Sequence, residues 1–201
     1  MPDTARILAV CTGNICRSPA IERLLAARLD DVEVSSAGTY AVVGHPMSGP
    51  MVPLIEAAGG SAAGFAARQL TASLLDGVDL VVTAARSHRS AVVELAPALV
   101  RRTFTLLELA RLLTAVPPEG TTTAERVRSI PAAAARARTM VPSGDDDVID
   151  PIGRPAQVYR RSFGQILPAV EAVAAAVAPE SEKGGVPTRN SPWNDPDTLS
   201  L

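Results

Sequence analysis

Two residues near the start of the chain could do chemistry together. Cys11 and Arg17 stand with five residues between them. A cysteine attacks as the thiolate, and both a helix N-terminus and a nearby arginine favour that form. An arginine guanidinium is a planar fork of donors that can hold two phosphate oxygens at once. The pair therefore predicts attack by the Cys11 sulfur on phosphorus, a phosphocysteine intermediate and its hydrolysis.

The residues around this pair predict a loop that curls around an anion. Residues 7–10 form an apolar run typical of a buried strand, and residues 20–29 carry the apolar spacing of a helix. Between a strand and a helix, backbone N–H groups and the helix N-terminus point at one spot. Gly13 and Asn14 most easily take the positive φ that such a loop needs. The predicted phosphate-binding residues are Thr12, Gly13, Asn14, Ile15, Cys16 and Ser18.

The wider pattern places this loop at the edge of a parallel sheet. Residues 32–36 alternate in polarity and predict a second strand, which makes the first unit β-α-β with a right-handed crossover. In such sheets the ligand lies beyond the carboxyl ends of the strands. Further strands are predicted at 79–83 and 100–104, and helices at 51–58, 72–75, 87–95, 106–113 and 156–178.

A thiolate nucleophile also needs a proton donor for the departing oxygen. A carboxylic acid on a separate loop could supply that proton. We expect it to protonate the leaving oxygen and then to act as base for the attacking water. Asp145, Asp146 and Asp147 are interpreted as a solvated acidic turn.

Residues 11–19, CTGNICRSP, resemble the signature loop of the low-molecular-weight protein tyrosine phosphatases, a loop that arsenate reductases of the same fold share. Residues 36–39, SAGT, resemble the family segment whose serine, here Ser36, supports the phosphate loop. Asp150 and Pro151 resemble the family's general-acid motif, and the resemblance implies that Asp150 is this acid and base. The resemblance implies an α/β fold, a doubly wound four-stranded parallel sheet flanked by helices. It also implies a phosphatase without metal or cofactor.

The resemblance further suggests how the cleft is built. Tyr40 lies in a loop that forms one wall of the cleft in the family, where it either stacks on a phenyl ring or packs on its own loop. Ile152 lines the same cleft, at a position where tyrosine-specific members often carry an aromatic residue. Phe65 stands where the family usually has a histidine. For Cys16 two interpretations stay open: a partner for a reversible disulfide with Cys11, or a small core residue.

Residues 116–147 make this chain longer than a compact family member. They predict a helix that Thr123 caps and that runs through residue 138, either a basic flap over the active site or an extra helix on the scaffold. Residues 86–89 are interpreted as a solvated helix start, and the alternative is a basic rim that attracts an anionic substrate. We expect a phosphatase-like domain over residues 1–178 and a disordered tail over 179–201, in which Trp193 is interpreted as having no role.

Composition narrows the partners. The formal net charge of −2 argues against general nucleic-acid binding and against a basic membrane patch. With two cysteines and two scattered histidines, His45 and His88, a zinc cluster is not expected. The polar start of the chain lacks the pattern of a signal peptide, so we expect a cytoplasmic protein. The expected partner is a phosphorylated protein or a small phosphate ester; the oligomeric state is not predicted.

Together these patterns predict hydrolysis of aryl phosphate monoesters, with phosphotyrosine first. One alternative is another reaction at the same loop, either arsenate reduction or dephosphorylation of a small metabolite. A further alternative is a phosphate-binding regulatory module without turnover, which the residues at 65 and 152 suggest.

Overall fold

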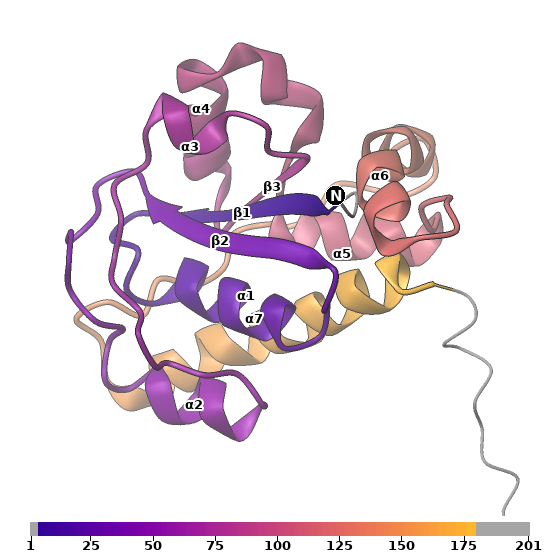
Figure 1. The fold of residues 1–201 in the computed structure, drawn as a ribbon. Helices are drawn as coiled ribbons and strands as arrows, with labels where there is room; N and C mark the ends of the chain where they lie inside the picture. Colours follow the sequence, from indigo (N-terminus) through magenta and orange to yellow (C-terminus); the bar gives the residue numbers. More distant parts are fainter. Residues whose placement is uncertain (1–3, 180–201) are drawn as a thin grey trace, which may run out of the picture.

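A computed structural model describes residues 4–179. Most of the predicted tail, with Trp193, lies outside the described residues, so the division into domain and tail stays a prediction. The chain builds one parallel sheet with the strand order β2-β1-β3-β4 (Figure 1). Its strands are β1 (Ala5–Cys11), β2 (Val32–Gly38), β3 (Leu80–Thr83) and β4 (Thr103–Thr105). The predicted fold class is confirmed.

Strand β1 lies at the centre of the sheet because its side chains are apolar on both faces. Ile7 and Ala9 belong to one hydrophobic cluster, and Leu8 and Val10 belong to a second cluster on the other face. Such a two-sided strand suits a parallel sheet with helices on both faces. In the register of the sheet, Cys11 stands opposite Gly38 of β2. The carboxyl ends of the two strands therefore meet at one edge.

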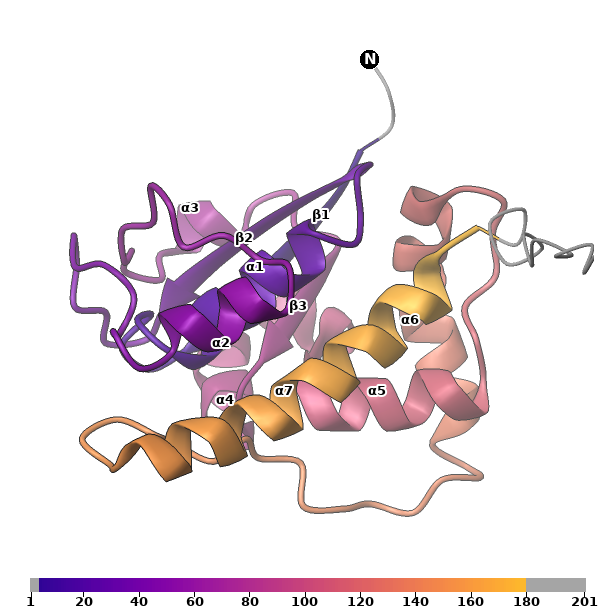
Figure 2. The ribbon, with the colours of Figure 1, turned by 90° about the horizontal axis from the view of Figure 1, so that it is seen from below.

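Helices cover both faces of the sheet (Figures 1 and 2). One face carries α1 (Arg17–Ala26), α5 (Leu106–Ala115) and α7 (Ala156–Val177), and α2 (Val52–Ala57) lies beside α1. The other face carries α3 (Ala72–Leu75) and α4 (Arg86–Leu95). Among residues 4–179, no helix combines the length and the apolar character that a bilayer crossing requires.

The fourth strand is shorter than predicted. Residues 97–102 form a 3₁₀ helix that begins at Pro97, and only Thr103–Thr105 pair with β3. Proline fixes φ in a range that suits the start of a helical turn, which removes residues 100–102 from the strand.

Helix α6 (Thr123–Ala137) forms the predicted insert, and it lies at the end of the sheet opposite the carboxyl ends of the strands (Figure 1). Arg128 donates from Nε to Asp79 Oδ1 over 3.1 Å, just before β3 begins. Thr122, one residue earlier than expected, caps the helix in a capping box with Glu125. The helix is therefore packed on the scaffold and does not overhang the predicted active-site loop.

Candidate active site

The loop between β1 and α1 is held by one buried asparagine. Asn14 takes a positive φ of 53°. Its amide Nδ2 donates to Ser18 Oγ over 2.9 Å and to Ser36 Oγ over 2.8 Å. Its Oδ1 accepts from the backbone N–H of Arg68 over 2.7 Å. The side chain thus binds the loop to α1, to β2 and to the segment before α3, and the predicted support by Ser36 runs through Asn14.

Strand β2 approaches the loop closely because Gly38 has no side chain. A Cβ at Gly38 would lie 2.3 Å from the carbonyl oxygen of Thr12, closer than any real contact. Just beyond it, the backbone N–H groups of Thr39 and Tyr40 donate to the carbonyls of Cys11 and Thr12 over 2.9 and 3.0 Å. These bonds fix the first residues of the loop.

The Cys11 sulfur lies at the end of β1, next to a hydroxyl. Cys11 Sγ and Ser18 Oγ are 3.0 Å apart, and either can be the donor. Ser18 Oγ accepts from Asn14 Nδ2, and its own hydrogen can be donated either to the sulfur or to the carbonyl of Ala37, 3.4 Å away.

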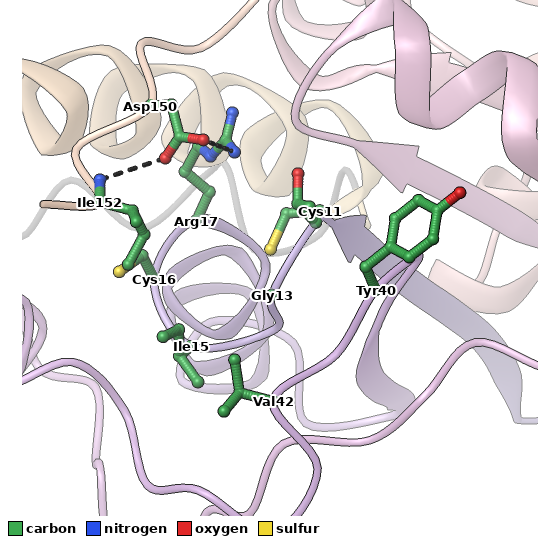
Figure 3. A pocket seen from close by; sticks show the side chains of 10 residues that line it. Cys11, Gly13, Ile15, Cys16, Arg17, Tyr40, Val42, Asp150 and Ile152 are labelled. Carbon is green, nitrogen blue, oxygen red and sulfur yellow. Dashed lines mark hydrogen bonds and ion pairs between the residues drawn. The ribbon is translucent and has the colours of Figure 1, made fainter.

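Arg17 and Asp150 meet beside the loop although 133 positions separate them. The buried Arg17 side chain donates from Nη2 to Asp150 Oδ2 over 2.6 Å and from Nη1 to the carbonyl of Val148 over 3.3 Å. Asp150 Oδ1 accepts from the backbone N–H of Ile152 over 3.2 Å (Figure 3). The Asp150 side chain is 52% exposed, so a ligand can reach it.

A cavity of about 240 Å³ opens over these groups (Figure 3). Its polar part holds the sulfur, the guanidinium and the carboxyl, and its rim is apolar, with Tyr40 82% and Ile152 48% exposed. The structure therefore brings the predicted nucleophile, anion clamp, acid and cleft residues together. The lining residues are Cys11, Thr12, Gly13, Ile15, Cys16, Arg17, Tyr40, Val42, Asp150 and Ile152.

Comparison with known proteins decides the family. Residues 6–114 match the family model described as low molecular weight phosphotyrosine protein phosphatase. The chain belongs to this family. This confirms the resemblance drawn from residues 11–19.

Three relatives show how far the similarity reaches. Etp of Escherichia coli K12, a low molecular weight protein-tyrosine-phosphatase, is 44% identical over 91 residues, which are 45% of this chain and 62% of Etp. The chain thus matches less than two thirds of the length of that relative. A protein-arginine-phosphatase of Geobacillus stearothermophilus is 29% identical over 176 residues, 87% of this chain and 97% of that protein. The crystal structure of the low molecular weight protein tyrosine phosphatase from T. tengcongensis is 26% identical, with a TM-score of 0.65, and covers 86% of this chain and 99% of that one.

In this family member, both cysteines are unpaired and buried. Burial raises the pKa of the Cys16 thiol to about 11, and hydrogen bonds with the Ser48 and Tyr159 side chains oppose the rise. Ser48 Oγ and Tyr159 OH are themselves 3.0 Å apart. Cys16 is therefore a neutral thiol at pH 7, and its disulfide with Cys11 stays a prediction.

Although Phe65 stands where the family usually has a histidine, side-chain hydrogen bonds still link the residues under the phosphate loop. Ser36 Oγ donates to a carboxylate oxygen of Glu22, and this completes a chain from Glu22 through Ser36 and Asn14 to Ser18. Phe65 lies beside this chain and packs under the Arg23 guanidinium, 5.6 Å from the centre of the ring.

The interpretation of residues 145–147 as a solvated turn is wrong for Asp146, and Asp147 is 41% exposed but bonded to the start of α4. Asp146 is buried and pairs with Arg111. Asp147 Oδ1 accepts from the backbone N–H of Arg86 over 2.8 Å. Asp145, with 88% of its side chain exposed, fits the expectation fully. The two pairs anchor the segment that leads to Asp150.

Sequence reasoning missed His88, which was assigned to a solvated helix start. Its side chain is buried, and its Nε2 lies 2.9 Å from Thr12 Oγ1 in the phosphate loop. Burial, and then the positive charge of Arg17, lower its pKa to about 4. The available signal was helical spacing, because His88 lies four residues before the buried Val92 and so faces the sheet.

No group of three or more His, Cys, Asp or Glu side chains in the described part of the chain is arranged to hold a metal ion.

Proposed function

We propose that the protein is a phosphatase that hydrolyses aryl phosphate monoesters through a phosphocysteine, with protein phosphotyrosine as its preferred substrate. The observation that carries the proposal is the shared cavity. Cys11 and Asp150 line the same opening, and Arg17 contacts the Asp150 carboxylate from its floor. Nucleophile, anion clamp and proton donor are the three groups that this reaction needs.

The first step transfers the phosphoryl group. The Cys11 thiolate forms the S–P bond while the P–O bond to the leaving group breaks, and Asp150 gives its proton to the departing oxygen. Arg17 and the loop N–H groups hold the phosphoryl oxygens.

The second step releases phosphate. Asp150, now a carboxylate, takes a proton from a water that attacks phosphorus and breaks the S–P bond. Ser18 Oγ, 3.0 Å from the sulfur, stabilises the thiolate as it leaves. Inorganic phosphate and the parent site result.

The rim of the cavity favours an aromatic substrate. Tyr40, Val42, Ile15 and Ile152 present apolar surface around the opening. A phenyl ring gains free energy by leaving water against such a wall. A guanidinium held there would leave N–H groups without acceptors, which costs free energy.

A second candidate is hydrolysis of protein phosphoarginine. The support comes from the Geobacillus stearothermophilus relative named a protein-arginine-phosphatase, because 97% of that protein matches this chain. Asp150 is the one carboxylate among the residues that line the cavity, and it already accepts from Arg17. We therefore place phosphotyrosine first.

A turnover panel tests the proposal. The parent protein is given p-nitrophenyl phosphate, a phosphotyrosine peptide, a phosphoarginine peptide of the same sequence, alkyl phosphates, and arsenate with a thiol. We expect the highest kcat/KM on the phosphotyrosine peptide. A higher kcat/KM on the phosphoarginine peptide would contradict phosphotyrosine as the preferred substrate. Reduction of arsenate without phosphatase turnover would contradict the proposed reaction.

Cys11→Ser is the matched control, because it removes the sulfur and keeps a side chain of similar size. We expect turnover to fall by about 10⁴-fold or more while inorganic phosphate still binds. If the parent binds phosphate but turns over no substrate, the alternative of a phosphate-binding regulatory module is favoured.

We also propose a cytoplasmic location, which the two unpaired thiols support.

A further inference from the structure

One buried ionisable group near the site has no part in the reaction described above. His88 is in the first turn of α4, and only 5% of its surface is exposed. Its Nε2 lies 2.9 Å from the hydroxyl of Thr12, the residue that follows the nucleophile. Thr12 lines the cavity, so His88 contacts the phosphate loop from behind.

Packing alone does not explain a histidine at this position. Its Nδ1 is buried and finds no hydrogen-bond partner among the described residues. A buried polar atom without a partner destabilises the fold, whereas an apolar side chain of similar size would not. The bond at Nε2 is therefore the feature that distinguishes His88 from a leucine at the same place.

The segment that carries His88 also holds the loop that leads to the acid. The carbonyl of Ala84 accepts from the N–H of Val148 over 2.8 Å, and the N–H of Arg86 donates to Asp147 over 2.8 Å. Residues 84–88 thus contact the phosphate loop through His88 and the acid loop through these two bonds. One rigid helix start joins the two loops that must act on the same phosphorus.

We propose that His88 is a positioning residue, which holds Thr12 and with it the first turn of the phosphate loop in register with the Asp150 loop. This inference rests on the proposed phosphatase function. The imidazole does not touch the reacting atoms, so its effect passes through Thr12. Catalysis is sensitive to such support, because misplacement of a reacting group by about 1 Å can cost about 100-fold in rate.

The charge state of the ring suits this task. Burial and the nearby Arg17 lower the pKa of His88 to about 4, while Asp150 and Asp147 act in the opposite direction. The ring is therefore neutral at pH 7. A neutral imidazole can bond to a hydroxyl without placing a second cation beside the arginine that must hold the phosphate.

The test is a double-mutant cycle between the two partners. His88→Leu and Thr12→Val remove the bond from either side and keep the size of each side chain. His88→Gln and Thr12→Ser retain a polar atom for it. His45→Gln is the matched control, because His45 is exposed. Each variant is measured for kcat/KM on aryl phosphates of graded leaving-group quality, for binding of inorganic phosphate by calorimetry, and for its thermal midpoint.

We expect His88→Leu and Thr12→Val each to lower kcat/KM by about tenfold, and the double variant to be no worse than either. His88→Gln should recover most of the loss, and His45→Gln should match the parent. The loss should be larger for poor leaving groups than for good ones, since a phosphate loop out of register holds the departing oxygen out of line with Asp150. The thermal midpoint of His88→Leu should equal or exceed that of the parent.

Two outcomes would overturn the inference. One is a kcat/KM of His88→Leu within twofold of the parent, and the other is a double variant that shows the product of the two single losses. If the parent lacks turnover on every substrate, the proposed function fails by itself. The same cycle is then read from the phosphate dissociation constant, where a tenfold coupled loss supports the role of His88 and independent losses refute it.

Discussion

The two ends of the sheet each bury an arginine, and they use it differently. At the carboxyl end, Arg17 is 5% exposed and donates to the carbonyl of Val148 and to the Asp150 carboxylate. At the opposite end, Arg126 of α6 is 4% exposed and donates to the backbone carbonyls of Ala176 and Gly120. Burial is the same, but the partners differ.

The partners decide what each arginine can do. The carbonyls that Arg126 contacts belong to the end of α7 and to the loop before α6, so its donors serve the fold. Arg17 contacts a half-exposed carboxylate and lines a cavity, so an incoming anion can share or replace its partner. A buried arginine indicates a binding site only where an acceptor can be exchanged.

The largest effect is expected from a substitution of Arg17, the residue that holds the phosphoryl group at the carboxyl end of the sheet. Arg17→Lys keeps the charge but loses the planar fork, so fewer donors meet the phosphoryl oxygens in the transition state. We expect kcat/KM on p-nitrophenyl phosphate to fall by about 10²–10³-fold, the cost of a lost transition-state donor. The urea midpoint should change little, and a large loss of stability would instead make Arg17 resemble Arg126.

The second prediction removes the carboxylate that pairs with Arg17. Asp150→Ala should slow substrates with poor leaving groups by about 10²-fold or more, because they depend on protonation of the departing oxygen. Substrates with good leaving groups should be slowed much less. The measurement is kcat/KM across a series of aryl and alkyl phosphates; an equal loss across the series would remove Asp150 from the acid role.

How well the sequence predicts this site depends on how far apart in the sequence the functional residues lie. The Cys11–Arg17 loop could be predicted because a strand, a loop and a helix within about twenty residues bring the groups together. Asp150 lies far along the chain, and its prediction rests on the resemblance of Asp150 and Pro151 to the family's general-acid motif. The structure places Asp150 at the cavity that Cys11 and Arg17 line, and its role as the acid stays a prediction.

Other features could not be predicted, because tertiary packing decides them. The spacing of His88 from Val92 indicates that α4 buries it against the sheet, but its contact with Thr12, 76 positions away, depends on how the strands are arranged. Asp146 is buried only because Arg111 of α5 lies beside it. The position of α6 depends on Asp79 and on the end of α7, which are far away in the sequence. The short fourth strand follows from Pro97 and could have been predicted.

The third prediction tests the arginine at the other end. Arg126→Lys leaves the carbonyls of Ala176 and Gly120 with fewer donors and buries an ammonium group, so we expect unfolding to become easier by about 3 kcal/mol. Turnover on p-nitrophenyl phosphate at a temperature where the variant is folded should equal that of the parent. Urea unfolding and kcat/KM, measured on one preparation together with Arg17→Lys, give the comparison directly, and a loss of activity without a loss of stability would contradict it.

The smallest expected effect is a pH dependence of the unfolding free energy that His88 causes at the carboxyl end of the sheet. The folded pKa of His88 is about 4 against an ordinary value of 6.5, so between these values the unfolded chain binds more protons than the folded chain. The contribution of the neutral ring is therefore complete above pH 6.5 and is lost as the pH falls toward 4. Relative to His88→Leu, the parent should lose at most about 1.4 kcal/mol per pH unit in this window. Urea unfolding of both proteins at pH 7, 6 and 5 measures the difference. If the unfolding free energies of the two proteins instead change in parallel with pH, His88 is protonated as easily in the folded protein as in the unfolded chain. The prediction would then be wrong.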